Sequence, residues 1–146
     1  MNRDRSQHCS QAAGGIDIEL DVLLSTSTMR HAGEPPCLVS RSSTRHMYWS
    51  IAQMITHHTS NGCDPRAGDL LGCGTPSAPS SADLGSLLEI TGGGTKPLGL
   101  PNGQTRTFLQ DGDEVTLRAR ARRDGAATIG FGGCAAIVQP ATRGGR

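Results

Sequence analysis

The sequence predicts an α+β fold that is rich in β structure, with one main amphipathic helix over about residues 44–61. Two observations support this prediction. The chain of 146 residues contains 20 Gly and 8 Pro but only 1 Trp, 1 Tyr and 2 Phe, a composition that favours turns and short strands over long helices. Apolar and polar residues also alternate along several short segments, as they do in half-buried strands.

The clearest strand signal is IDIELDVL, residues 16–23, where aliphatic residues alternate with acidic ones. In the second half of the chain, strands are expected in TRTFL (105–109), EVTLRARAR (114–122) and TIGFGGCAAIV (128–138), with QDGD (110–113) as a hairpin turn. The second half is therefore predicted to be a β meander. The arginines of EVTLRARAR have no aromatic residues among them, so we interpret them as a solvated strand face.

Two shorter strands are less regular. One is expected at Leu70–Leu71, directly after the turn-like stretch CDPRAGD (63–69). The other is SLLEIT, residues 86–91, which the Gly-rich turn GGGTKP (92–97) ends. GGGTKP lacks the spacing and the following helix of a phosphate-binding loop, so it is interpreted as a turn only.

The helix is predicted because apolar residues recur at helical spacing between residues 44 and 61. Ser42, Ser43 or Thr44 is expected to cap its start. His57 and His58 are adjacent, so their side chains point about 100° apart on a helix and cannot chelate one ion as an i, i+4 pair can. His58 continues the apolar stripe, which favours a hydrogen-bonded structural histidine.

Charge and cysteine content exclude several classes of protein. The formal net charge of +1 gives no general attraction to nucleic acid or anionic lipid. The polar start of the chain and the short apolar runs predict neither a signal peptide nor a membrane span. Free thiols in a reducing cytoplasm are the simplest interpretation of an odd number of cysteines without a CxxC pair, namely Cys9, Cys37, Cys63, Cys73 and Cys134.

Two residues are candidates for chemistry. Glu89 lies between apolar neighbours after a polar loop, where a carboxylate at the edge of a cleft can orient a histidine or activate water. By pattern alone, a solvent-facing strand position is the simpler interpretation. Thr75 follows Gly72, Cys73 and Gly74, and its hydroxyl with nearby amides could bind a substrate carboxylate. An ordinary turn is the alternative there.

Several longer motifs, in their order and spacing, resemble the C-terminal region of the fumarylacetoacetase family. The resemblance runs from about residue 15 to residue 141, whereas residues 1–14 match less clearly and 142–146 form a polar tail. It is specific because THHTSNGC, GDLLGCGT and LQDGDEV are not generic turn or strand patterns. The segments that carry it are MYWSIAQMITHHTSNGCDPRAGDLLGCGT (47–75), GSLLEI (85–90), GTKP (94–97), NGQTRTFLQDGDEV (102–115) and IGFGGC (129–134).

The resemblance implies a mixed β-sandwich roll, a homodimer, and a cytoplasmic enzyme of tyrosine and phenylalanine catabolism. It implies that a Ca or Mg ion assists the hydrolysis of 4-fumarylacetoacetate to fumarate and acetoacetate. By position in GSLLEI, the family's catalytic glutamate, which orients a histidine, corresponds to Glu89. By position in GCGT, its substrate-binding threonine corresponds to Thr75. These assignments favour the functional interpretation of both residues.

The family's metal-binding carboxylates and catalytic histidine precede the region that this chain matches. The resemblance therefore predicts no metal ligand here, and Asp17, Glu19 and Asp21 belong to a different strand. A C-terminal fragment, inactive alone and active only with a complementary N-terminal portion, is the leading hypothesis. The alternatives are an acylpyruvate hydrolase or hydratase-decarboxylase relative, and a non-catalytic assembly module.

Overall fold

The computed structural model describes residues 16–80 and 83–142. Its helical segments are α2 (Ser27–His31), the 3-10 turn η1 (Thr44–His46), α3 (Ile51–Thr59) and α4 (Leu87–Ile90). Its strands are β1 (Ile18–Ser25), β2 (Cys37–Ser43), β3 (Leu98–Gly99), β4 (Thr105–Arg106), β5 (Glu114–Ala121) and β6 (Ile129–Ile137). One antiparallel sheet has the order β2-β1-β5-β6, and β3 pairs with β4 in a second, smaller one. The predicted β-rich α+β class is confirmed.

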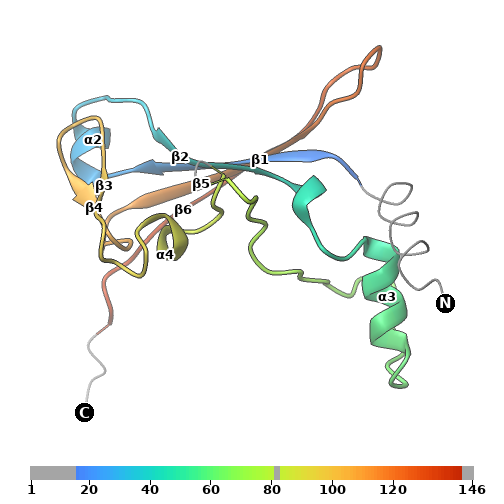
Figure 1. Ribbon diagram of the computed structural model, residues 1–146. Helices are drawn as coiled ribbons and strands as arrows, with labels where there is room; N and C mark the ends of the chain where they lie inside the picture. The colour runs from blue at the N-terminus through green and yellow to red at the C-terminus, as the bar shows by residue number, and fades with distance from the viewer. Residues whose placement is uncertain (1–15, 81–82, 143–146) are drawn as a thin grey trace.

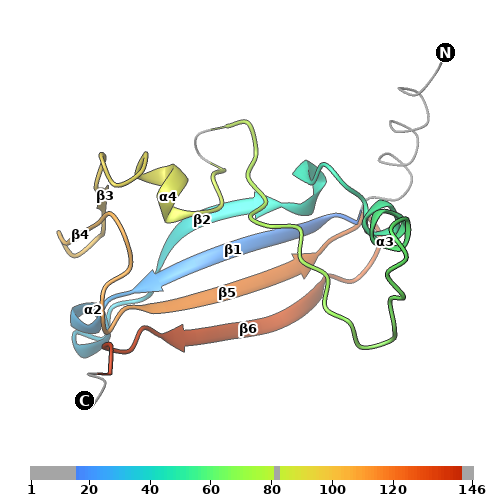
Figure 2. The same cartoon turned by 90° about the horizontal axis from the view of Figure 1, so that it is seen from below.

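The four-stranded sheet is the centre of the molecule (Figure 1). The elements α2, β3 and β4 lie at one end of it, and α3 lies beyond the other end. Figure 2 shows that residues 60–80, which follow α3, cross one face of the sheet, and Figure 1 shows α4 on the same side. This face is the one that carries the candidate site.

The buried core is small and lies at the α2 end of the sheet. Leu24 of β1 and Met29 of α2 are fully buried, and Leu100 is nearly so. The guanidinium of Arg30 donates to the carbonyl oxygens of Ser25 (2.7 Å) and Gly112 (2.5 Å). These bonds join α2 to the residues just before β5. Together with the buried core, they stabilise this end of the sheet.

An ion-pair ladder covers part of the other face of the sheet. Glu19 of β1 pairs with Arg120 of β5, which is its direct cross-strand neighbour. Asp21 pairs with Arg41 of β2 at 2.6 Å, also directly opposite. The Arg120 hydrogen bond lowers the pKa of Glu19 against a smaller desolvation effect. The positive charge of the β5 arginines, which were interpreted as a solvated strand face, is therefore partly neutralised by the acidic residues of β1.

A buried ion pair anchors the LQDGDEV motif. Asp113 is 1% exposed and Arg106 is 7% exposed. Two guanidinium nitrogens of Arg106 donate to the two carboxylate oxygens of Asp113, at 2.8 and 2.9 Å. The backbone N–H of Gln110 donates to Asp113 as well, at 2.9 Å. The pair thus joins β4 to the turn before β5, and its two-pronged geometry is the strong kind of ion pair.

Three strand predictions are confirmed, one is confirmed only in part, and two are wrong. The alternating segments 16–23, 114–122 and 128–138 form β1, β5 and β6. Leu70–Leu71 is not a strand, and the TRTFL strand is reduced to β4, which pairs with β3. The turn at 110–113 therefore does not close a hairpin between β4 and β5, and the second half is not a simple meander. Segment 86–91 contains the single helical turn α4.

The amphipathic helix exists but begins later than predicted. The backbone of Met47 is extended, and α3 begins after Ser50 rather than after residues 42–44. The Ser50 hydroxyl accepts from the Gln53 N–H, while the Gln53 side chain accepts from the Ser50 N–H. This capping box determines where the helix starts. No residue of α3 is buried, so His58 is exposed and the prediction of a structural histidine is wrong.

Other predictions concern the chain as a whole. None of the described helices is long and apolar enough to cross a membrane. The four cysteines in the described ranges, Cys37, Cys63, Cys73 and Cys134, are free thiols, as predicted. Cys9, the segment 1–14 and residues 143–146 lie outside the described residues.

Candidate functional site

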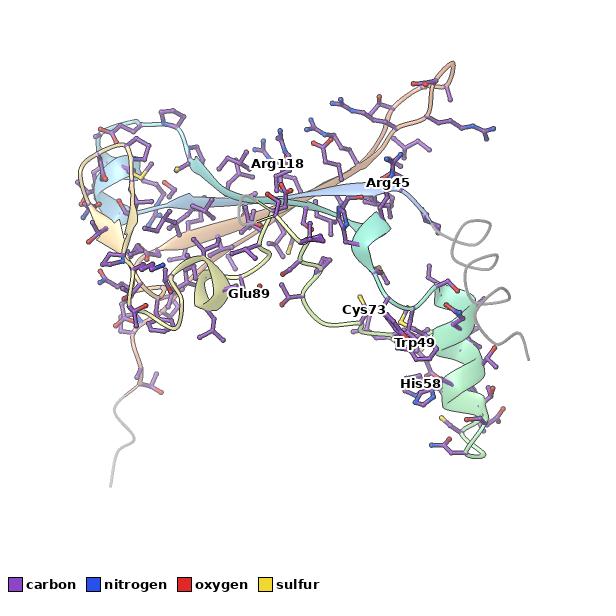
Figure 3. All side chains as sticks on the ribbon, in the orientation of Figure 1. Arg45, Trp49, His58, Cys73, Glu89 and Arg118 are labelled. Atoms are coloured by element: carbon purple, nitrogen blue, oxygen red, sulfur yellow. The ribbon has the colours of Figure 1, made fainter. Side chains whose placement is uncertain are left out.

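Glu89 lies on α4, the helical turn on the face of the sheet opposite Arg118 (Figure 3). The turn forms because Ser86 caps it: the Ser86 hydroxyl accepts from the Glu89 N–H at 3.3 Å. The same hydroxyl donates to Glu89 Oε2 at 2.8 Å. The hydrogen bond from Ser86 holds the carboxylate of Glu89 in place. Because Glu89 is exposed, this carboxylate remains accessible.

A second hydroxyl reaches the same carboxylate from a different segment. Ser77 donates to Glu89 Oε2 at 2.8 Å and accepts from the Gly85 N–H at 3.0 Å. We call Ser77, Ser86 and Glu89 the serine–glutamate cluster. The hydrogen bonds from Ser86 and then Ser77 lower the pKa of Glu89, against a smaller opposing effect of desolvation. The cluster therefore favours the ionised form of this carboxyl group.

Thr75, the second predicted site residue, lies two residues before Ser77. The cluster therefore joins the segment that carries Thr75 to the turn that carries Glu89. Thr75 is exposed, and it borders two hollows. One, of about 470 Å³, is also lined by Trp49, His57 and His58. The other, of about 440 Å³, lies against the sheet. The structure thus places the two predicted residues on segments joined by the Ser77–Glu89 hydrogen bond, and Thr75, but not Glu89, lines the two hollows.

The larger hollow is lined by aromatic, histidine and sulfur-containing side chains. Trp49, His58 and Cys73 are shown beside α3 in Figure 3. The rings of Trp49 and His57 are stacked, with centroids 6.0 Å apart. His57 and His58 therefore face a hollow that Thr75 also borders, which the spacing of apolar residues along the helix did not indicate.

Gly85 allows the two segments to approach closely. A Cβ at Gly85 would lie 2.4 Å from the Thr75 methyl carbon and 2.7 Å from the Pro76 carbonyl oxygen. We expect Gly85→Ala to separate the segments and to lower the free energy of unfolding by about 1–3 kcal/mol, the usual cost of overpacking.

Chemical denaturation followed by circular dichroism measures this loss. Gly72→Ala is the matched control, because a Cβ at Gly72 meets no atom within 4 Å. Equal stability of the two variants would show that the close approach at Gly85 is not required.

The described residues do not fit a complete metal site. Among residues 16–80 and 83–142, no group of three or more His, Cys, Asp or Glu side chains is arranged to hold an ion. Asp17, Glu19 and Asp21 lie in or beside β1, where each pairs with an arginine. We therefore assign no metal ligand to this part of the chain.

Comparison with known proteins identifies the family of the chain. The family model described as "Fumarylacetoacetate (FAA) hydrolase C-terminal" matches residues 14–139. The chain belongs to the fumarylacetoacetate hydrolase family. The human fumarylacetoacetase is 45% identical over 133 residues, which are 91% of this chain and 30% of the human protein. The fumarylacetoacetase of Arabidopsis thaliana is 45% identical over 124 residues, covering 85% of this chain and 28% of the plant protein.

This member of the fumarylacetoacetate hydrolase family is also 42% identical to the fumarylacetoacetase of Dictyostelium discoideum, over 130 residues that are 29% of that protein. The chain therefore spans less than a third of the length of these relatives. The resemblance inferred from the motifs is confirmed, and it applies to the C-terminal portion of the relatives.

Sequence reasoning missed Ser77 and Ser86 as parts of the site. A signal for Ser86 was present, because Ser-x-x-Glu before or within an apolar run is a helix-start pattern, and Ser86 and Glu89 have this spacing. Ser77 carried no local signal, because its bond to Glu89 spans 12 residues of chain.

Proposed function

We propose that this chain supplies the C-terminal part of the active site of a fumarylacetoacetase-type hydrolase, which cleaves carbon-carbon bonds in 1,3-dicarbonyl compounds. The substrate is 4-fumarylacetoacetate, an intermediate of tyrosine and phenylalanine breakdown, and the products are fumarate and acetoacetate. The observation that supports this most strongly is the hydrogen bond to Glu89 from Ser77, which lies two residues after Thr75. A family match over residues 14–139 supports the same reaction class.

In the proposed reaction, Glu89 orients a histidine that the N-terminal portion supplies. The histidine takes a proton from water, and the oxygen attacks the ketone carbon of the fumaryl group, which becomes a carboxylate of fumarate. The tetrahedral intermediate then collapses. The carbon-carbon bond breaks, its electron pair leaves on the acetoacetate carbon as an enolate, and that carbon takes up a proton. Thr75 donates a hydrogen bond to a carboxylate of the substrate.

The family resemblance implies that Ca or Mg takes part, with ligands outside the described residues. When bound, such an ion would polarise a dicarbonyl oxygen as a Lewis acid. Since the described residues do not form a site for the ion, none of the steps assigned to this chain depends on it. The partners that the proposal requires are a complementary N-terminal portion and, as the resemblance implies, a second copy in a homodimer.

Reconstitution tests this proposal. The purified chain is assayed for loss of 4-fumarylacetoacetate with Ca or Mg present, alone and after mixing with the N-terminal portion of a fumarylacetoacetase relative. We expect turnover only in the mixture. Turnover by the chain alone would contradict the proposal that its active site is incomplete. Acylpyruvates assayed in parallel distinguish the proposal from an acylpyruvate hydrolase, which would prefer them.

A non-catalytic assembly module is the second candidate, and the exposure of β6 favours it. β6 pairs with β5 on one side, no described strand pairs with its other side, and all nine of its residues are exposed. Open strand edges associate with other chains. A mixture that forms a complex but has no turnover would support this function.

The open edge also gives a prediction for the isolated chain. Phe131 of β6 is 61% exposed, so we expect Phe131→Lys to reduce self-association, because a charge on an edge strand opposes pairing. Light scattering at increasing concentration measures the effect. Leu70→Lys is the control, since Leu70 is 98% exposed but lies outside the sheet. Equal scattering by both variants would mean that β6 is not the site of association.

A further inference from the structure

Two serine hydroxyls from different segments donate to one oxygen of Glu89. Ser86 is its neighbour on α4, and Ser77 comes from the segment that carries Thr75. Both distances to Glu89 Oε2 are 2.8 Å. Two donors on one oxygen determine the orientation of the whole carboxylate plane, because that oxygen can no longer turn toward another partner.

The direction of each hydroxyl proton is determined by backbone groups. The Ser77 oxygen accepts from the Gly85 N–H at 3.0 Å, and the Ser86 oxygen accepts from the Glu89 N–H at 3.3 Å. A serine hydroxyl has only one proton to donate. Since each oxygen already accepts from an amide, each proton is directed at Glu89 Oε2. The arrangement is therefore set by the chain path and not by free rotation of the hydroxyls.

All groups that lower the pKa of Glu89 are neutral donors. Ser86 has the largest effect, Ser77 follows, and the backbone amides of Ser86 and Gly85 add to it; no charged side chain is among the causes. A carboxylate stabilised in this way is a poor proton acceptor and a good partner for a cationic imidazole. These properties suit an orienting group.

We propose that Ser77 and Ser86 are positioning residues of the active site, which hold Oε2 of Glu89 and direct Oε1 toward the histidine that it orients. This inference rests on the proposed function. Ser77 also joins the segment that carries Thr75 to the turn that carries Glu89, because Ser77 follows Thr75 by two residues.

The first test uses the chain as it is and requires no activity. Carboxyl-carbon NMR of the chain labelled at glutamate follows the titration of Glu89. We expect a pKa below the usual value for glutamate, about 4.3. Ser77→Ala and Ser86→Ala should each raise it, while Ser77→Thr, which keeps the hydroxyl, should restore it. An ordinary pKa in the unaltered chain, or no rise in either alanine variant, would overturn the proposal.

Ser60→Ala is the matched control, because the Ser60 hydroxyl donates to the His57 carbonyl at 2.7 Å and not to Glu89. In the reconstituted mixture, Ser77→Ala should lower kcat by up to about 10²-fold, the effect of a misplaced catalytic group. Unchanged kcat with a raised Glu89 pKa would overturn the positioning role. If the unaltered mixture has no turnover, the proposed function fails, whereas the NMR result still tests the geometry of the cluster.

Discussion

Asp113→Asn is expected to lower the free energy of unfolding by about 3–5 kcal/mol, because it leaves the guanidinium of Arg106 buried without its counter-charge. The effect is large because domains of this size are usually stable by about 5–15 kcal/mol. Arg106 is 7% exposed, so water cannot replace the lost carboxylate. Urea denaturation followed by circular dichroism measures the change.

Asp111→Asn is the control for this variant. Asp111 lies two residues earlier in the same turn and is exposed, so its substitution should change stability by less than about 0.5 kcal/mol. Similar midpoints for the two variants would show that the buried pair does not stabilise the fold. A combined Arg106→Leu and Asp113→Leu variant should lose less than the sum of the single variants, because it removes both charges.

The same pair predicts how stability depends on pH. Burial alone would raise the pKa of Asp113, but hydrogen bonds from Arg106 and Gln110 and the charges of Arg106 and Arg30 lower it overall. The stabilisation is therefore present above the ordinary pKa of an aspartate, about 3.9, and is lost as pH falls through the lowered value. Asp113→Asn should flatten the stability curve below about pH 4.

Glu89→Gln is expected to reduce turnover in the reconstituted mixture by about 10²–10⁴-fold, the range by which general-base catalysis accelerates reactions. The amide keeps the size of the side chain but removes the charge that would stabilise the oriented histidine. Loss of that charge also lowers the pKa of the histidine, so the acidic limb of the kcat profile should shift to lower pH. A structural defect alone would not cause this shift.

Glu34→Gln is the control, since Glu34 is exposed, follows α2 and is not part of the serine–glutamate cluster. Both variants should still bind the N-terminal portion, as measured by size-exclusion chromatography. If Glu89→Gln keeps full turnover, Glu89 does not act in catalysis, whatever the family match implies.

The sequence predicted the long strands because their side chains alternate with a period of two. Ile18, Leu20 and Val22 on one face and Glu19 and Asp21 on the other are enough to define β1 without tertiary information. The partner strands could not be predicted in the same way. β1 pairs with β5, about 100 residues away, as in the Glu19 to Arg120 contact that spans 101 residues.

The candidate site shows a similar division. Glu89 and Thr75 were identified from motif resemblance, but the strand predicted around Glu89 was wrong. Leu87, Leu88 and Ile90 are apolar enough for a strand, and only the capping by Ser86 makes the segment a helical turn. The contribution of Ser77 depends on the path of the chain between residues 77 and 89, which no local pattern specifies.

The ion pairs on the far face of the sheet also oppose a shift in the register of β1. Sliding β1 by a single position would turn Glu19 and Asp21 toward the side where α4 lies and would bring Leu20 and Val22 into water. Both changes are unfavourable, so Arg41 and Arg120 act as a register lock. Through that lock, residues remote from Glu89 determine which side of the sheet carries α4.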